Sequence, residues 1–272
     1  MTGLRGIRRG YIDAAGGQVH YREAGRLGSP VLLLLHQSPS SSAMYEVLMR
    51  QLADHFHLLA PDTPGFGNSD PLPRQTGTLE ISDYAAVIAA FIAAFDIAPC
   101  FVFGHHTGAA ITVQLEHDFP GTARAVALSG PTLLTEEQRK ALPRRATPLP
   151  PVEDGSHLQA MWQRIREKDN GAPQELTQRE VISAIAAGPA YLASYEAVCR
   201  QDFAAQLDSV RCPVLVFAGD EDPLYAAVDP TVARLAQGER ADLPGGERTY
   251  VCERQVEEVA RLLLDFFQTG KR

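Results

Sequence analysis

A histidine stands at the centre of the segment Gly104-His-His-Thr-Gly108, directly after the apolar run 100–103. Two glycines around one residue at the end of such a run are typical of a sharp turn from a strand into a helix. That turn holds its central side chain on a strained backbone, often a serine that acts as a nucleophile. Here the residue is His106, and neutral imidazole is itself a base and a nucleophile near neutral pH.

Asp222 offers the acidic partner that a reactive imidazole needs. It closes the turn Gly219-Asp-Glu-Asp222, which follows the apolar run 213–217. A carboxylate beside an imidazole fixes the tautomer and stabilises the imidazolium that forms when the ring takes a proton. Because an imidazole is longer than a serine side chain, we expect the ring of His106 to reach Asp222 and form a His–Asp dyad.

Apolar runs alternate with helical segments along most of the chain and predict the sheet that positions these residues. The runs lie at 30–35, 57–60, 100–103, 124–128 and 213–217, and a short strand is expected near 241–243. Helices are expected at about 43–54, 78–95, 107–117, 230–237 and 256–267, and a β-hairpin at 11–23. Continuous apolar runs fit strands that are buried on both faces of a parallel sheet. The predicted fold class is α/β, with a mostly parallel, twisted sheet flanked by helices.

One long segment interrupts this alternation. Residues 131–207 read as helical, are proline-rich at 142–152 and contain no convincing strand. We therefore predict a core made of residues 1–130 and 208–272, with residues 131–207 inserted as a helical cap. Insertions above the carboxyl ends of strands commonly cover a functional site.

Four motifs in this order resemble the α/β-hydrolase fold superfamily over nearly the whole chain. The segment His36-Gln-Ser-Pro39 is similar to a His-Gly-x-Pro oxyanion motif, and Asp62-Thr-Pro-Gly-Phe-Gly-Asn-Ser69 to an Asp-x-x-Gly-x-Gly-x-Ser turn. The nucleophile elbow at 104–108 and the acid turn ending at Asp222 follow. The resemblance implies an oxyanion hole built from the backbone N–H groups of Ser38 and Thr107, which do not depend on the missing serine.

Two departures from the family pattern concern the catalytic residues. His106 replaces the nucleophilic serine, and no histidine stands at the usual base position, where Glu247 or Arg248 aligns. Since the last histidine of the chain is His157, a Ser-His-Asp triad cannot be assembled.

Three roles for His106 therefore remain open. It acts as a general base on a small carbonyl substrate, by activating water to cleave an ester, a lactone or a C–C bond, or by abstracting a proton as in a lyase. Alternatively, it is a nucleophile that forms an acyl-imidazole. In the third case, the protein is a non-catalytic relative that binds a small molecule.

Four further residues are candidates for substrate binding. Gln37 opens a hydroxyl-rich segment that can hydrogen-bond a polar group, and Tyr45 and Trp162 could line a partly apolar pocket. Arg248 could bind a substrate carboxylate, or pair with Asp222 and compete with the dyad. The alternatives are that Trp162 packs in the core of the cap and that Arg248 is a surface charge.

Composition and motifs exclude several other classes of function. A net charge of −8 argues against nucleic-acid binding. There is no P-loop, no Gly-x-Gly-x-x-Gly after a strand and no cluster of metal ligands, so no cofactor and no metal are expected. The apolar runs are too short for a membrane span, no signal peptide is recognisable and the four cysteines are widely spaced. We expect a cytoplasmic protein with a small-molecule substrate; the sequence leaves the oligomeric state open.

Overall fold

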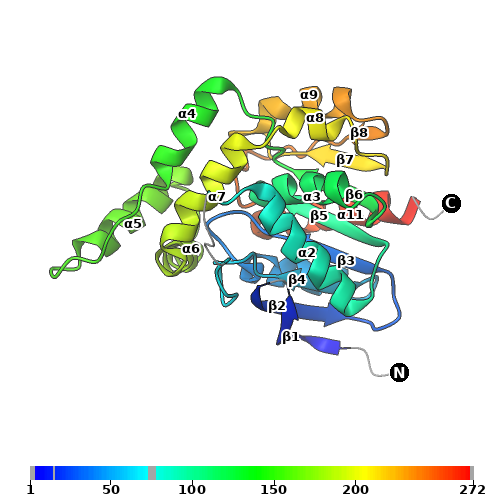
Figure 1. Ribbon diagram of the computed structural model, residues 1–272, viewed down its shortest axis with the longest axis horizontal. Coiled ribbons are helices and arrows are strands. Elements are labelled where there is room, and N and C mark those ends of the chain that lie inside the picture. Colours follow the sequence, from blue (N-terminus) through cyan, green and yellow to red (C-terminus); the bar gives the residue numbers. More distant parts are fainter. Residues whose placement is uncertain (1–3, 15, 73–77, 270–272) are drawn as a thin grey trace.

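The computed structural model describes residues 4–14, 16–72 and 78–269. Eight strands form one sheet in the order β1-β2-β4-β3-β5-β6-β7-β8 (Figure 1). They are β1 (Leu4–Ala14), β2 (Gly17–Gly25), β3 (Val31–Leu35), β4 (His57–Pro61), β5 (Cys100–His105), β6 (Ala123–Ser129), β7 (Val214–Phe217) and β8 (Gly238–Arg240). β1, β2 and β4 pair antiparallel and every other neighbouring pair is parallel, which confirms the predicted fold class.

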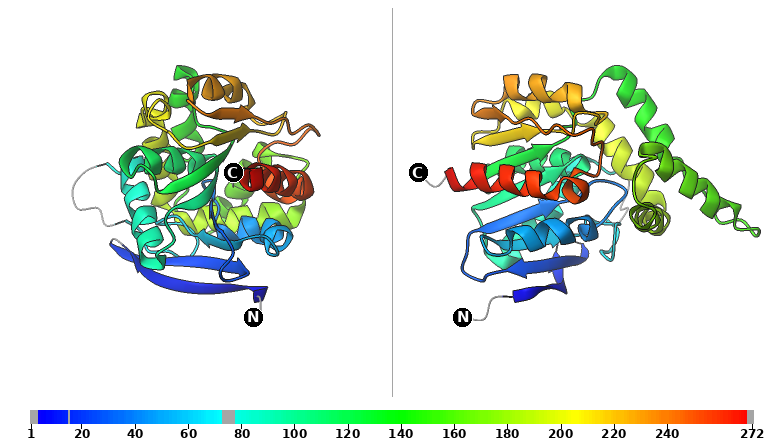
Figure 2. Two further views of the ribbon diagram at one scale, coloured as in Figure 1. Left: turned by 90° about the vertical axis from the view of Figure 1, so that its right-hand side faces the viewer. Right: turned by 180° about the vertical axis from the view of Figure 1, so that it is seen from behind.

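Helices cover both faces of this sheet (Figures 1 and 2). On one face lie α2 (Ile81–Phe95), α3 (Thr107–Asp118), α8 (Phe203–Leu207) and α9 (Val228–Arg234), the last preceded by the 3-10 turn η2 (Tyr225–Ala227). On the other face lie η1 (Ser42–Tyr45), α1 (Glu46–Leu52), α10 (Val251–Arg254) and α11 (Val256–Thr269). Alternate residues of β3 face opposite layers, Leu33 and Leu35 towards the first and Leu32 and Leu34 towards the second. This is why its sequence is a continuous apolar run.

The segment between β6 and β7 lies wholly within the described residues and contains helices but no strand. It contains α4 (Glu136–Arg145), α5 (Ser156–Lys168), α6 (Gln174–Ala187), α7 (Pro189–Arg200) and α8. Helices α4 and α5 extend away from the sheet, whereas α7 runs back towards it (Figure 1). The residues Met161, Ile165, Val181 and Tyr191 form a separate apolar cluster among these helices. Because α8 packs against the core through Phe203, we treat α4–α7 as the proposed cap.

Several element boundaries differ from the sequence-based expectation: the hairpin expected at 11–23 is longer, and the helix expected at 230–237 lies at Val228–Arg234. The helix expected at 43–54 begins as the 3-10 turn η1 and becomes α-helical only at Glu46. The last strand lies at Gly238–Arg240 rather than at 241–243. Its residues are largely exposed at the edge of the sheet, so it lacks the apolar run that marks the inner strands. Within the described residues, no single helix is long and apolar enough to cross a membrane; α6 and α7 pass that test only as a pair bent by 90°.

Candidate active site

His106 occupies the sharp turn between β5 and α3. Its backbone has φ 49° and ψ −109°, and Asp96 is the only other non-glycine residue in the described ranges with a positive φ. The flanking glycines are required by close packing: a Cβ at Gly108 would lie 1.9 Å from the carbonyl oxygen of Leu35, and one at Gly104 would lie 2.4 Å from that of Gly108. Strained backbone of this kind persists only where the surroundings hold it, and it is common at active sites.

The ring of His106 contacts Asp222, as expected. His106 Nε2 lies 2.7 Å from Asp222 Oδ2, and Asp222 Oδ1 accepts a hydrogen bond of 2.7 Å from Leu224 N. The Asp222 side chain is 1% exposed, whereas the His106 side chain retains 16% and can meet a small molecule. Burial disfavours the Asp222 carboxylate, but the charge and hydrogen bond of His106 outweigh it and lower the pKa of Asp222 below 3.8. Asp222 is therefore ionised at neutral pH and orients the imidazole.

The two segments expected to form an oxyanion hole lie side by side. Ser38 N donates a hydrogen bond of 3.3 Å to Thr107 Oγ1, and Tyr195 Oη donates to Ser38 O at 3.1 Å. Thr107 is the first residue of α3, and the first N–H groups of a helix have no acceptor within it. A substrate oxyanion here would meet the Thr107 N–H. There are two ways to gain a second donor. The Ser38 N–H could turn from Thr107 Oγ1 to the oxyanion, or the Thr107 hydroxyl could itself donate to the oxyanion.

His105 lies below the elbow and is fully buried. Its Nε2 donates to Thr249 O at 2.9 Å, while its Nδ1 accepts from the Ser129 hydroxyl at 3.0 Å. Burial, assisted by the neighbouring His106, lowers the pKa of His105 to about 3. Neutral His105 therefore joins the elbow to the loop where the family usually carries its base.

His105 is expected to stay neutral over about pH 5–8, the range in which a free imidazole titrates. Its folded pKa of about 3 lies below the unfolded value of 6.5, so the unfolded chain binds a proton first as the pH falls. This group therefore lowers folding stability progressively below about pH 6.5. Ring chemical shifts of His105 across that range measure its protonation. A titration above about pH 5 would contradict the buried, neutral state.

The usual base position offers no substitute for the missing histidine. Glu247 is buried and pairs with Arg254 Nε at 3.0 Å. Arg248 Nη1 donates to Lys168 O at 3.1 Å, and its Nε lies 3.7 Å from Glu221. The suggested pairing of Arg248 with Asp222 is thus wrong, since Asp222 is occupied by His106 and Leu224. Arg248 instead bonds the backbone of Lys168, the last residue of α5.

Comparisons with known proteins assign this fold to a family. A family model of the alpha/beta hydrolase fold matches residues 30–229. The chain belongs to the α/β-hydrolase fold family.

Several relatives of this α/β-hydrolase-fold protein are hydrolases. It is 28% identical to 2-(acetamidomethylene)succinate hydrolase of Mesorhizobium japonicum, covering 94% of this chain and 93% of that protein. An uncharacterized hydrolase of Saccharomyces cerevisiae is 56% identical over 52 residues, which are 19% of this chain and only 18% of that relative. The crystal structure of E-2-(acetamidomethylene)succinate hydrolase superposes with a TM-score of 0.80 at 25% identity, covering 96% of this chain and 99% of the other. A thermophilic esterase from Thermogutta terrifontis superposes at 0.79 with 18% identity over 97% and 100% of the two chains, a likeness of fold alone.

Tyr45 does not line a pocket in this α/β-hydrolase-fold protein, so the expectation that it lines the substrate pocket is wrong. It is fully buried, packs against Phe103 and donates its hydroxyl to Leu35 O at 2.7 Å. The turn of η1 points this side chain into the layer beneath the sheet. Burial also raises the pKa of Tyr45 well above 10.0.

The other two substrate candidates lie in the regions that the sequence indicated. Gln37 is buried in the oxyanion segment, and its carbonyl accepts from His36 Nδ1 at 2.8 Å. His36 Nε2 in turn accepts from Thr63 N at 2.8 Å, so His36 anchors this loop. Trp162 is partly buried against the apolar cluster of the cap, in agreement with the alternative that it is a core residue. Contact of Gln37 or Trp162 with substrate stays a prediction.

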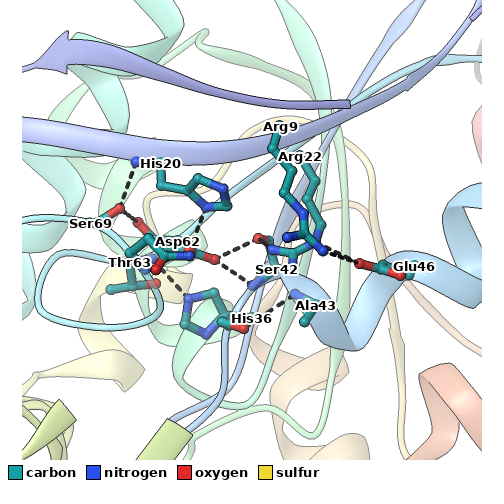
Figure 3. Close-up of polar contacts among 12 residues, drawn as sticks. Arg9, His20, Arg22, His36, Ser42, Ala43, Glu46, Asp62, Thr63 and Ser69 are labelled. Atoms are coloured by element: carbon teal, nitrogen blue, oxygen red, sulfur yellow. Dashed lines mark hydrogen bonds and ion pairs between the residues drawn. The ribbon is translucent and has the colours of Figure 1, made fainter. Parts of the chain in front are cut away.

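A buried polar network holds the loop 36–42 of the α/β-hydrolase-fold core (Figure 3). Asp62 bonds His20 Nδ1 at 2.7 Å and the Ser42 hydroxyl at 2.5 Å, and Arg22 Nη1 donates to Ser42 Oγ at 2.6 Å. Burial opposes ionisation of Asp62, yet the bonds from His20 and Ser42 hold its pKa well below the usual range. Ser42 and Asp62 are fully buried, so this Ser-Asp-His grouping braces the loop and is closed to substrate.

Ion pairs that sequence reasoning missed join the cap to the core. Arg179 of α6 pairs with its neighbour Glu180 at 2.7 Å and with Glu253 of α10. The Ser40 hydroxyl of the oxyanion loop donates to Glu180 Oε1 at 2.9 Å. Burial raises the pKa of Glu253 to about 7 although Arg179 opposes that rise. No periodic pattern marks these residues, and only the fold brings Glu253 and Ser40 to the adjacent residues Arg179 and Glu180.

Proposed function

We propose that this protein is an enzyme that uses His106, oriented by Asp222, as a general base on a small carbonyl compound. The observation that carries the proposal is the 2.7 Å contact between His106 Nε2 and Asp222 Oδ2 at a strained elbow. A carboxylate only accepts, so Nε2 bears a proton, and in the neutral ring Nδ1 keeps a lone pair. No acceptor or donor in the described parts of the chain contacts Nδ1, which leaves it available to a substrate or a water molecule.

Hydrolysis is the reaction that the relatives favour. In it, His106 Nδ1 removes a proton from water as the oxygen attacks the carbonyl, and the negative charge develops on the carbonyl oxygen. The tetrahedral intermediate then collapses: the carbonyl re-forms, the bond to the leaving group breaks, and the leaving group takes the proton that Nδ1 held. The N–H groups of Thr107 and Ser38 support that charge, aided by the N-terminus of α3. The same groups would stabilise an enolate if Nδ1 instead removed a proton next to the carbonyl, as in a lyase.

The relative that matches nearly the full chain acts on 2-(acetamidomethylene)succinate. Its substrate name combines an acyl amide with a conjugated carbon–carbon double bond. We therefore propose small acyl compounds as the first substrate class: amides or esters whose leaving group is an enamine or an enol. The hydrogen bonds from Tyr195 to Ser38 and from Ser40 to Glu180 support a role of α4–α7 as the cap over this site.

The test is a panel of p-nitrophenyl acetate, enol-lactones, enamides and 1,3-dicarbonyl compounds, incubated with the protein in heavy-oxygen water. Hydrolysis incorporates the label into the product, whereas proton abstraction gives turnover without label. An acyl-imidazole intermediate would appear as a burst of the first product. A protein that saturates with a compound and returns it unchanged would be a binder, and the proposal would fail.

Replacing Asp222 by asparagine is expected to lower kcat by about 10²-fold or more, because the amide stabilises neither the tautomer nor the imidazolium. Since the pKa of Asp222 lies below 3.8, its supporting charge is present above that pH and is lost only in more acidic solution. The pH profile of the wild type should thus show no fall from Asp222 above about pH 4. Asp220→Asn is the control, because Asp220 bonds Gly245 N and Gly246 N instead. Equal losses in the two variants would contradict the dyad.

A further inference from the structure

Gly130 lies where the imidazole of His106 has to pass. His106 follows β5 and Asp222 follows β7, and β6 lies between these two strands in the sheet. The ring must therefore cross the carboxyl end of β6, which ends at Ser129. A Cβ at Gly130 would lie 2.2 Å from His106 Cδ2 and 2.4 Å from its Nε2.

The backbone around Gly130 is fixed on both sides. Gly130 N donates to Phe217 O of β7 at 2.9 Å, and His106 N donates to Ser129 O at 2.9 Å. Gly130 has a φ of 62°, a region that favours glycine. The ring of His105 lies 4.3 Å, centroid to centroid, from that of His106 and limits how far the latter can swing. A side chain at 130 could not be relieved by a small local shift.

We infer that Gly130 is a positioning residue of the dyad: its missing side chain lets the His106 ring cross β6 to Asp222 and thereby fixes which imidazole nitrogen faces the substrate. Gly130 and Asp222 cover the ring edge that carries Cδ2 and Nε2. The opposite edge, with Nδ1, is then the reactive one. In the usual triad the assignment is reversed, with Nδ1 on the aspartate and Nε2 on the nucleophile.

This geometry narrows the chemistry, and here the inference rests on the proposed function. The base nitrogen and the first oxyanion donor come from consecutive residues, His106 and Thr107. The proton that Nδ1 removes must therefore lie close to the carbonyl whose oxygen takes the charge. That proton belongs to the attacking water or to the carbon next to the carbonyl.

The experiment is Gly130→Ala, observed by nitrogen NMR of the histidine rings. In the wild type, His106 should be the Nε2–H tautomer with its proton hydrogen-bonded to the carboxylate. In Gly130→Ala we expect that signal to be lost, and kcat on any substrate of the panel to fall by about 10²-fold with little change in KM. A retained Nε2–H signal together with unchanged kcat would overturn the inference.

Two controls separate the clash with His106 from backbone strain. Gly121 has a φ of 86°, and a Cβ placed there would have no atom within 4 Å, so Gly121→Ala carries similar strain without a clash and should leave the tautomer unchanged. In a His106→Ala background, Gly130→Ala should lower Tm less than it does in the wild type, because the ring is gone. Equal losses in both backgrounds would overturn the inference, even if Gly130→Ala folds too poorly for NMR. The NMR experiment reads the tautomer without any substrate. A failure of the proposed activity can therefore be told apart from a failure of the inference about Gly130.

Discussion

Replacing His106 by alanine is expected to lower kcat by about 10²- to 10⁴-fold on any substrate that the wild type turns over, the range typical of a positioned general base. The physical reason is that the imidazole of His106, oriented by the Asp222 carboxylate, supplies the lone pair that takes the proton. The proposed oxyanion donors are backbone groups and stay in place, so some activity should remain and KM should change less than kcat. Steady-state and single-turnover kinetics separate the effect on substrate binding from the effect on the chemical step.

His106→Ser provides the sharper comparison, because it restores the residue type that the family usually carries at the elbow. We expect no efficient esterase from it, since a serine hydroxyl needs an adjacent base. Glu247 pairs with Arg254, and Arg248 binds Lys168 O, so neither is free to serve. His117→Ala, which removes an exposed imidazole bonded to Ser209, is the matched control. Strong esterase activity in His106→Ser would show that another group acts as the base.

The dyad could be predicted because two local patterns fix its ends. The glycines at 104 and 108 mark the elbow, and the order of strands brings the turn that ends at Asp222 to the same edge of the sheet. The role of Gly130 could have been predicted from the same strand order. An imidazole at the end of β5 that contacts a residue at the end of β7 must pass the end of β6, and it needs a residue without a side chain there.

Side-chain directions in irregular segments could not be predicted in the same way. Tyr45 follows the oxyanion loop in sequence, yet η1 turns it into the core, and a short 3-10 turn has no periodicity that reveals its buried face. The sequence leaves Arg248 free to pair with Asp222, to bind a substrate carboxylate or to be a surface charge, and only the fold shows that it donates to Lys168 O. The pair between Arg179 and Glu253 connects residues that are 74 positions apart, a distance over which local sequence carries no information.

That cluster leads to the largest effect that we expect on stability. Arg179 is 28% exposed, but its partners Glu180 and Glu253 are only 1% and 9% exposed. Replacing Arg179 by methionine leaves two buried carboxylates without a cation, and breaking a buried pair in this way costs about 3–5 kcal/mol of unfolding free energy. The loss should also weaken the attachment of the cap, because Glu253 belongs to α10 of the core and Glu180 holds Ser40.

The effect of Arg179→Met should depend on pH, because Glu253 can escape its unfavourable charge by protonation. Its folded pKa is raised to about 7 from 4.5, so its stabilising contribution is full below 4.5 and is lost as the pH rises through 7. Without Arg179, which opposes that rise, the pKa should rise further. The destabilisation should then be larger at about pH 8.5 than at about pH 5.5 when measured by urea unfolding. Arg240→Met is the matched control: Arg240 also pairs with two carboxylates, Asp229 and Asp242, but these are 71% and 73% exposed and water screens them. If the two variants lose the same free energy of unfolding at both pH values, burial does not make the Arg179 pairs more stabilising than the exposed Arg240 pairs, and the prediction is wrong.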